Sequence, residues 1–285
     1  MTSPKRPKFV LITGCSKGGI GYALAREFSA KGMQVIATAR SKEKIADLGP
    51  LGITLLSLDV DDPASIAQLK VDVTRITDGK LDILVNNAGR NYTVPALDID
   101  FAEVEQTFRT NVFGVMRMCQ AFAPLLIEAR GTIVQIGSVA AIMPYVFGSV
   151  YNASKAALHQ YSNTLRVELA PFGVKVVTIV TGGVKSNIAN IDRVLPEDSY
   201  YLPIAKEYAR RVKHSQEMGI PNEQYAKYVV PKVLKNRSRQ IWGGFGAWWI
   251  WFASTFLPMS LLDIVFTRMF NLWKLKQANT KKKLT

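Results

Sequence analysis

The sequence contains few of the residues from which disulfide frameworks and metal centres are built. Its 285 residues include only two cysteines, Cys15 and Cys119, and two histidines, His159 and His214. The cysteines fall in different expected elements, which argues against a disulfide framework and favours a reducing compartment. Neither histidine has a partner at the spacing of metal ligands. Both are therefore expected to be structural or surface residues, and no metal site is predicted.

The sequence also lacks an N-terminal targeting pattern and any internal repeat. Residues 1–7 are polar and basic, and the first apolar run begins only at about residue 8, so no signal peptide is expected. No low-complexity tract interrupts the chain. Its length is ample for one α/β domain with a large core and leaves residues for a smaller extension.

Short apolar runs alternate with helical patterns from residue 9 to about residue 180. The runs lie at 9–12, 34–39, 54–58, 81–85 and 132–137. Strands that alternate with helices predict parallel pairing, because each helix returns the chain to the same edge of the sheet. The expected fold class is α/β, a doubly wound, mostly parallel sheet of the Rossmann type. Such a sheet holds a dinucleotide at the carboxyl ends of its strands.

A glycine-rich turn follows the first apolar run. Residues 13–21 read Thr-Gly-Cys-Ser-Lys-Gly-Gly-Ile-Gly, and a helical pattern begins directly after them. Glycines let the backbone approach a phosphate, and the helix N-terminus adds unpaired N–H groups and the positive end of its dipole. The turn therefore predicts a site for the cofactor pyrophosphate.

A tyrosine and a lysine four residues apart, Tyr151 and Lys155, follow a serine, Ser138, that ends the run at 132–137. Apolar residues at helical spacing predict a helix over 151–168, so the phenol and the ammonium lie on one face. A nearby ammonium favours the phenolate and would lower the phenol pKa from about 10. Tyr151 would then exchange a proton with a carbonyl or an alcohol, while Ser138 holds the same oxygen. Taken alone, the pattern also fits a core tyrosine and a solvated lysine.

These motifs, in their order along the chain, resemble the short-chain dehydrogenase/reductase family over roughly residues 8–235. The resemblance implies that Tyr151 is the general acid/base and that Lys155 lowers its pKa and binds the nicotinamide ribose. It further implies that Ser138 polarises the substrate carbonyl and that Asn111 holds a water in the proton relay. The expected catalytic residues are thus Tyr151, Lys155, Ser138 and Asn111.

The same resemblance implies a set of cofactor-binding residues. They are Gly14, Ser16, Lys17, Gly19, Ile20, Gly21, Arg40, Asp59, Val60, Asn87, Ala88, Gly89, Tyr151, Lys155, Gly182, Val184 and Ser186.

The chain departs from the family pattern in two places. Four residues instead of three separate Gly14 from Gly19, which should lengthen the loop. Gly18 is therefore given less weight as a cofactor-binding residue. Thr181 stands where the family has a proline before Gly182, which should loosen the loop over the nicotinamide.

The end of the second strand lacks a carboxylate. An acid there would bind the ribose 2′-hydroxyl of NAD and repel a 2′-phosphate. Here the strand runs into Arg40, and Lys17 in the glycine turn offers a second cation. The expected cofactor is NADP(H), although either side chain taken singly also fits an ordinary surface charge.

Positive charge and tryptophan are concentrated towards the C-terminus. Residues 204–285 hold 15 of the 36 Lys and Arg but only 4 of the 22 Asp and Glu, and all five tryptophans lie between Trp242 and Trp273. Basic residues interleaved with so apolar a stretch fit an anionic lipid surface better than nucleic acid, which is not expected as a partner.

The stretch 240–262 has no ionisable residue and would reach about 33 Å as a helix, close to the thickness of a bilayer. Glycines near its start and Pro258 near its end interrupt a helix. A monotopic or hairpin insertion of residues 241–273 is therefore preferred to a single span. A hydrophobic substrate lid and a dimer contact are the two packed alternatives.

The expected organisation has two parts. A catalytic domain at 8–235 includes a variable substrate cover at about 186–230, and a hydrophobic, Trp-rich and basic membrane-associating tail follows at 236–285. Lys282 and Lys283 resemble a dilysine retrieval signal, which implies the endoplasmic reticulum membrane and lipid droplets, with the catalytic domain facing the cytosol.

Within the family, the motifs are most similar to those of the reductases of ether-lipid and phosphatidate synthesis. The implied reaction is NADPH-dependent reduction of the ketone of 1-acyl-dihydroxyacetone phosphate, with Lys206, Arg210, Arg211 and Lys213 as candidate phosphate partners. A membrane-bound hydroxysteroid or retinol type dehydrogenase is the alternative enzyme, and an idle NADPH-binding protein of the lipid surface is the alternative of another class. The assembly is left open between a homodimer and a homotetramer.

Overall fold

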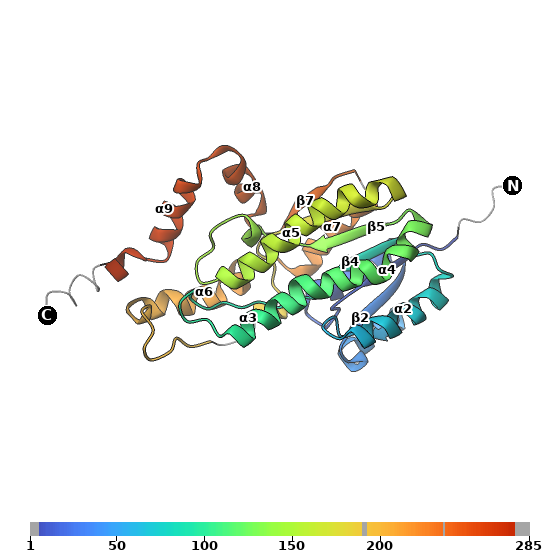
Figure 1. Cartoon of the computed structure of the whole chain (residues 1–285), viewed down its shortest axis with the longest axis horizontal. Coiled ribbons are helices and arrows are strands. Elements are labelled where there is room, and N and C mark those ends of the chain that lie inside the picture. Colours follow the sequence, from blue (N-terminus) through green and yellow to red (C-terminus); the bar gives the residue numbers. More distant parts are fainter. Residues whose placement is uncertain (1–5, 190–192, 236, 277–285) are drawn as a thin grey trace.

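The structure, a computed structural model, describes residues 6–189, 193–235 and 237–276. Within these residues seven parallel strands form one sheet in the order β3-β2-β1-β4-β5-β6-β7 (Figure 1). The strands are β1 (Phe9–Ile12), β2 (Gln34–Ala39), β3 (Thr54–Ser57), β4 (Ile83–Asn86), β5 (Thr132–Ile136), β6 (Lys175–Thr181) and β7 (Gln240–Gly243). The expected doubly wound parallel sheet is confirmed, because strand order reverses between β1 and β4.

Helices cover both faces of the sheet. They are α1 (Ile20–Ala30), α2 (Pro63–Thr77), α3 (Phe101–Phe108), α4 (Val115–Ala129), α5 (Ser149–Leu169), α6 (Ala205–Met218), α7 (Asn222–Lys235), α8 (Ala247–Phe256) and α9 (Met259–Met269). One core lies between the sheet and α1 with α7, and a second lies between the sheet and α2, α4 and α5. Both faces are buried, which explains why the central strands are apolar at nearly every position.

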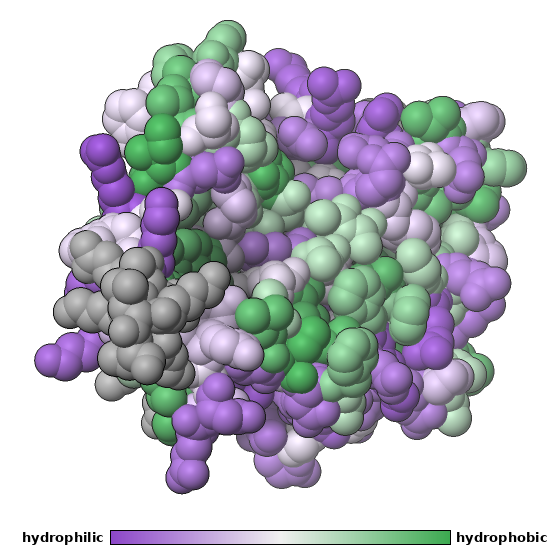
Figure 2. Space-filling model, turned by 60° about the vertical axis from the view of Figure 1, so that its left-hand side comes forward, coloured by the Kyte–Doolittle hydropathy of each residue, from purple (hydrophilic) through white to green (hydrophobic). Residues whose placement is uncertain are grey.

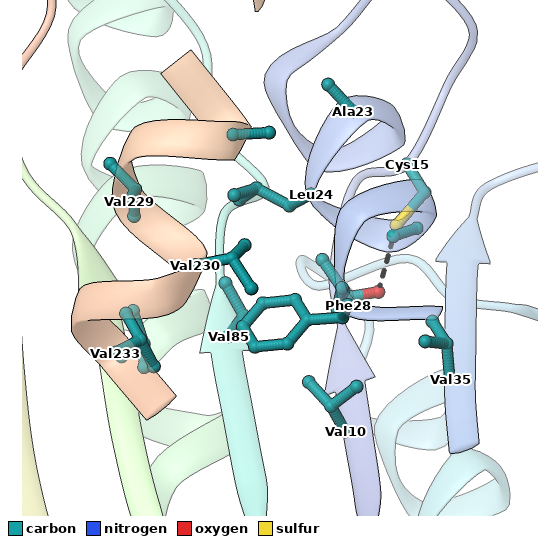
Figure 3. Close-up of a cluster of buried hydrophobic side chains, with 14 of the residues drawn as sticks. Val10, Cys15, Ala23, Leu24, Phe28, Val35, Val85, Val229, Val230 and Val233 are labelled. Carbon is teal, nitrogen blue, oxygen red and sulfur yellow. Dashed lines mark hydrogen bonds between the residues drawn. The ribbon is translucent and has the colours of Figure 1, made fainter. Parts of the chain in front are cut away.

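Helix α7 is a core element and not part of a cover. Figure 3 shows Val230 of α7 directed towards Leu24 and Phe28 of α1. Val229 and Val233 belong to the same cluster, and all five side chains are buried. The expected cover at 186–230 therefore extends too far. Its last part, from the start of α7, packs on the sheet because apolar residues recur at helical spacing along it.

Strand β7 lies inside the region expected to be a separate tail. Ile241 is buried beside Ile179 of β6, and the two strands pair over four residues. The boundary expected at residue 236 therefore does not coincide with the edge of the catalytic domain. An uncharged stretch fits a buried strand as well as a membrane segment, and the sequence alone could not separate the two.

By length and composition, the one helix among the described residues that reaches the size of a membrane span is Phe101–Ala129. It contains α3 and α4, and Met118 and Phe122 of its second half are buried in the core of the domain. In the C-terminal region, α8 and α9 have 10 and 11 residues and are separated at Pro258. The interruption predicted at this proline is present.

Helix α9 packs on the carboxyl edge of the sheet through one face. Phe266 of α9 and Phe270, the residue that follows the helix, have ring centres 5.7 and 6.0 Å from that of Tyr145, and Phe270 also contacts Phe147. Tyr208 of α6 packs on the other side of Phe147, with ring centres 5.5 Å apart. The cluster places α6, α8 and α9 around the end of the sheet where the candidate site lies.

Cys15 and Cys119 are buried in the two different cores and are free. Burial raises the pKa of the Cys15 thiol to about 12 and that of the Cys119 thiol to about 11. Neither thiol ionises near neutral pH, so both act as small core residues.

Candidate active site

A cavity of about 950 Å³ lies at the carboxyl ends of the strands. One wall carries the glycine turn, Asp59 and the segment after β4, and another carries Ser138, Tyr151 and Lys155. The opposite wall consists of side chains from α6, α8 and α9. Cofactor elements and a hydrophobic chamber therefore open into one continuous space.

The glycine turn has the conformation that a pyrophosphate site requires. Gly14 and Gly18 have φ values of +70° and +78°, which side chains rarely adopt. A Cβ on Gly21 would lie 2.4 Å from the Asn87 amide nitrogen, so only glycine lets α1 approach this close. Gly19 caps α1 without a side-chain hydrogen bond, which leaves the first N–H groups of the helix for an anion. The turn fits a dinucleotide. Gly18, to which the motif comparison assigned less weight, is needed for the shape of the turn because of its positive φ.

Asn87 fastens the glycine turn to the end of β4. Its side-chain amide donates to the carbonyl oxygens of Thr13 and Gly14, at 2.8 and 2.9 Å. The Thr13 hydroxyl in turn accepts from the backbone N–H groups of Asn87 and Ala88. Two neighbouring strands are thus locked together where the cofactor would lie.

Asn111 lies in a π-helical segment, Arg109–Gly114, between α3 and α4. Such bulges are frequent at functional sites because they re-aim one side chain. The Asn111 amide accepts from the Arg90 N–H at 2.9 Å and donates to the Arg90 carbonyl and the Ser154 hydroxyl at 3.0 Å. Its side chain therefore positions the segment after β4, and a Cβ on Gly89 would lie only 3.2 Å from it.

Ser138 is held from behind by a buried histidine. The Ser138 backbone N–H donates to Nε2 of His159 at 3.1 Å, and a Cβ on Gly137 would lie 2.1 Å from the same nitrogen. Burial, together with the charge of Lys155, lowers the pKa of His159 to about 4. The imidazole is therefore neutral near pH 7 and accepts through Nε2. His159 is structural, as expected, but it acts on the catalytic serine.

Lys155 is buried and lies 5.9 Å from the centre of the Tyr151 ring. Its ammonium donates to the carbonyl oxygen of Ile136 at 2.9 Å. Burial lowers the pKa of Lys155 to about 8. The helix predicted from the spacing is present as α5, so phenol and ammonium share a face as expected.

The pKa of Tyr151 shifts in the direction opposite to the expected one. Burial raises it, and the hydrogen bond with Ser138 and the charge of Arg211 only partly offset that effect. A cation that favours the phenolate from outside α5 is Arg211 of α6. The sequence could not reveal this, because Arg211 is 60 residues further along the chain.

The loop after β6 is firmly held although Thr181 replaces the family's proline. The Thr181 hydroxyl lies 2.6 Å from the phenol oxygen of Tyr225, and the Gly182 N–H donates to the Gly243 carbonyl at 2.8 Å. Gly183 exchanges two backbone hydrogen bonds with Phe245. The expectation of a loosened loop is wrong, because β7 and α7 supply new partners.

The two predicted partners of a 2′-phosphate differ in their surroundings. Arg40 is exposed and lines the cavity at the end of β2. Lys17 is turned to a neighbouring hollow, where its ammonium lies 3.1 Å from a carboxylate oxygen of Asp47. Arg40 is therefore the better placed of the two cations for a phosphate.

The structure brings most of the predicted site residues together. The cavity is lined by Gly14, Ser16, Gly19, Ile20, Arg40, Asp59, Val60, Asn87, Ala88, Gly89, Ser138, Tyr151, Lys155, Gly182, Val184 and Ser186. Lys17, Gly21 and Asn111 lie just outside it and act through packing or hydrogen bonds. Sequence reasoning missed Thr13 and the role of His159, which no motif marked.

Residues 8–193 match the sequence pattern of the family described as short chain dehydrogenase. The chain belongs to that family. Its members use a nicotinamide dinucleotide to oxidise alcohols or reduce carbonyls, so this protein is an NAD(P)-dependent oxidoreductase.

Relatives in the family cover nearly the whole chain. The short-chain dehydrogenase srdE of Neurospora crassa is 46% identical over 280 residues, 97% of each chain. The NADPH-dependent 1-acyldihydroxyacetone phosphate reductase of Schizosaccharomyces pombe is 42% identical over 255 residues, 84% of this chain and 86% of the relative. A short-chain dehydrogenase from Streptomyces avermitilis has a similar solved structure, with a TM-score of 0.75, 28% identity, and coverage of 97% of this chain and 99% of that chain.

The site can therefore perform the family chemistry with the residues described. A bound nicotinamide dinucleotide supplies or accepts the hydride at the substrate carbon. The Tyr151 phenol would exchange the proton at the substrate oxygen, and the Ser138 hydroxyl would hold that oxygen in place, as expected from the resemblance.

Proposed function

We propose that this protein reduces the ketone of 1-acyl-dihydroxyacetone phosphate with NADPH, giving 1-acyl-glycerol 3-phosphate at a lipid surface. One observation carries the proposal: the catalytic tyrosine opens into a chamber that is lined by apolar side chains and by a buried cation. Ile250, Leu262 and Phe266 line the apolar side, and Arg211 lies near Tyr151. An acyl chain and a phosphate would each find a matching surface.

The direction of the reaction is supported by the state of Tyr151. Its pKa is raised above the ordinary value, mainly by burial, so the phenol carries its proton near neutral pH. A protonated phenol hydrogen-bonded to Ser138 is ready to donate to a carbonyl oxygen as hydride arrives at the carbon. Reduction therefore starts from the protonation state that the folded protein favours.

The choice of NADPH is supported by Arg40 and by the absence of an acid at the last residue of β2, Ala39. A guanidinium can form two parallel hydrogen bonds with a phosphate. The relative from Schizosaccharomyces pombe is itself named as NADPH-dependent.

The lipid surface is supported by the position of the chamber's mouth. Trp249, Val265 and Met269 line the cavity and are also 67%, 48% and 42% exposed, so the cavity opens between α8 and α9. Trp248 and Phe256 extend the exposed apolar surface beside it. Figure 2 shows hydrophobic residues gathered in its upper left part, over these helices.

Such an arrangement suits shallow insertion into a lipid monolayer. Tryptophans favour the interface between headgroups and acyl chains, and a helix pair of 10 and 11 residues is too short to span a bilayer. The proposal places the protein on the cytosolic face of the endoplasmic reticulum and on lipid droplets. Lys282 and Lys283, which favour that location, lie outside the described residues.

The substrate is tested by incubating purified protein and NADPH with 1-acyl-dihydroxyacetone phosphates, steroid ketones and retinoid carbonyls, and by following nicotinamide absorbance. We expect turnover of the acyl-dihydroxyacetone phosphates. Turnover of a steroid or a retinoid alone would replace the proposed substrate with the alternative enzyme class. NADPH binding without any turnover would indicate an idle binding protein.

Membrane association is tested with a matched pair of phenylalanines. Phe256 is exposed at the end of α8, whereas Phe172 is equally apolar and exposed but precedes β6, at the opposite edge of the sheet. Phe256→Ser should weaken co-sedimentation with vesicles containing anionic lipid, and Phe172→Ser should not. Equal binding by both variants would show that α8 does not contact the membrane.

The hairpin geometry is tested separately with a tag inserted before Lys281 in intact microsomes. Digestion of the tag by protease without detergent is expected. Protection until detergent is added would place the tail in the lumen.

A further inference from the structure

Arg211 of α6 is a buried cation with no acidic partner among the described residues. Its side chain is only 6% exposed, and no ion pair within residues 6–189, 193–235 and 237–276 includes it. A guanidinium stays charged in proteins, so its burial has a cost that is not balanced by a carboxylate. A buried unpaired charge therefore calls for a functional explanation.

The guanidinium is held so that one end faces the cavity. Its carbon lies 3.7 Å from the centre of the Tyr145 ring, and Nε donates to the Val146 carbonyl at 3.1 Å. No hydrogen bond to another described residue uses its two terminal nitrogens. Arg211 lines the cavity beside Tyr151. The fixed contacts hold the plane of the guanidinium and leave up to four N–H groups for a ligand.

Lys155 is also buried without an ion pair among the described residues, but its ammonium donates to the Ile136 carbonyl. The other basic side chains near the cavity differ from Arg211. Arg90 and Arg193 both bind the Glu103 carboxylate, at 2.5 and 2.8 Å. Arg210 is exposed and donates to the Met269 carbonyl, and Lys206 is exposed on α6. The side chain of Lys213, also a candidate from the sequence, lies outside the described part of the structure. Arg211 is the candidate that is both buried and unpaired.

We propose that Arg211 forms an anion subsite that binds the charged group of the carbonyl substrate next to the reacting ketone. The inference rests on the proposed function and deepens it, because it assigns the phosphate of the substrate to one residue. In 1-acyl-dihydroxyacetone phosphate the phosphate is attached to the carbon beside the ketone carbon. A cation near Tyr151 can therefore bind the phosphate while Tyr151 reaches the ketone oxygen. Bidentate binding would also fix which face of the ketone meets the nicotinamide.

The test uses two substrates that differ only in the anion, 1-acyl-dihydroxyacetone phosphate and 1-acyl-dihydroxyacetone. Arg211→Met should lower kcat/KM for the phosphorylated substrate about 10²-fold or more, and for the neutral substrate by no more than a few-fold. Lys227→Met removes an exposed charge from α7, which does not line the cavity, and should leave both values unchanged. Arg211→Lys should recover part of the loss, because it keeps the charge but not the fork.

Equal losses on both substrates, in an Arg211→Met protein with a native melting temperature, would show that Arg211 acts only through Tyr151 and would overturn the subsite. An unchanged preference for the phosphorylated substrate would overturn it as well. If Arg211→Met fails to fold, the substrate preference of Arg211→Lys decides between the same outcomes.

A second measurement separates this inference from the proposed function. If the wild type reduces another carbonyl and no acyl-dihydroxyacetone phosphate, the proposed function fails, but sn-glycerol 3-phosphate can still be tried as an inhibitor. Competitive inhibition that Arg211→Met weakens at least tenfold, and Lys227→Met does not, would support the anion subsite. Absent or equal inhibition in all three proteins would reject it.

Discussion

The two walls of the active-site cavity are held by different kinds of interaction. The wall formed by β1, β4, β5 and α5 is fastened by hydrogen bonds to the backbone, such as those of Asn87, Asn111 and His159. The wall formed by α6, α8 and α9 is held mainly by apolar and aromatic packing around Phe147 and Phe270. Hydrogen bonds fix position and angle, whereas apolar packing tolerates changes in shape.

The two kinds of contact correspond to different functions of the two walls. Proton and hydride transfer need atoms placed within a few tenths of an ångström, so the catalytic wall is built from directional contacts and close-fitting glycines. Substrate choice needs a surface that can vary, and the packed wall provides one. Changes in the first wall should therefore alter turnover, and changes in the second should alter stability, substrate preference and surface binding.

The largest effect is expected from Tyr151→Phe. The change removes the proton donor and leaves the ring, so kcat should fall by a factor of about 10² to 10⁴ while cofactor binding changes little. Steady-state kinetics and a titration of NADPH fluorescence measure the two quantities. Near-native turnover of the variant would show that Tyr151 is not the proton donor.

A large loss of stability is expected from Phe270→Ala in the packed wall. Phe270 is 1% exposed, and its truncation should lower the free energy of unfolding by about 3 to 5 kcal/mol. Phe256→Ala is the matched control, because Phe256 is 62% exposed and should contribute little to folding in water. Chemical denaturation compares the two. Equal stabilities would show that α9 is not a part of the cooperative fold.

A pH-dependent effect of about 3 kcal/mol is expected from His159 in the catalytic wall. Its pKa falls from 6.5 to about 4 on folding, so the unfolded chain takes up a proton first as the pH is lowered. The stability that the neutral imidazole provides is full above about pH 6.5 and is lost as the pH falls towards about 4.

His159→Gln keeps an acceptor for the Ser138 N–H but does not titrate. The difference in unfolding free energy between wild type and variant, measured from pH 7 to pH 4, should therefore shrink or reverse by that amount. A difference that is independent of pH would mean that folding does not lower the pKa of His159.

The smallest effect is expected from Arg40→Asp, at the site expected for the 2′-phosphate of the cofactor. The change replaces a phosphate partner with a charge that repels phosphate, and should shift the ratio of kcat/KM for NADPH over NADH by about 10-fold to 100-fold towards NADH. Lys17→Ala should shift it less, because Lys17 already pairs with Asp47. An unchanged ratio for Arg40→Asp would assign the choice to another residue.

The sheet, the order of its elements and most residues of the catalytic wall could be predicted from the amino-acid sequence. Gly14, Ser138 and Lys155 belong to short motifs in which neighbouring residues set the geometry, through a turn, a strand end or one face of a helix. These local rules can be applied without knowing which distant residues come into contact. The parallel sheet and the shared helix face of Tyr151 and Lys155 were predictable for this reason.

The environment of the residues after β6 became clear only from the fold. The structure places β7 in the sheet, α7 in the core and Arg211 where its charge favours ionisation of Tyr151. In each case an uncharged or basic stretch was compatible with several environments, and the environment comes from residues far away in sequence. The pKa of Tyr151 depends on burial, which no local pattern measures, so the direction of its shift could be known only from the folded chain.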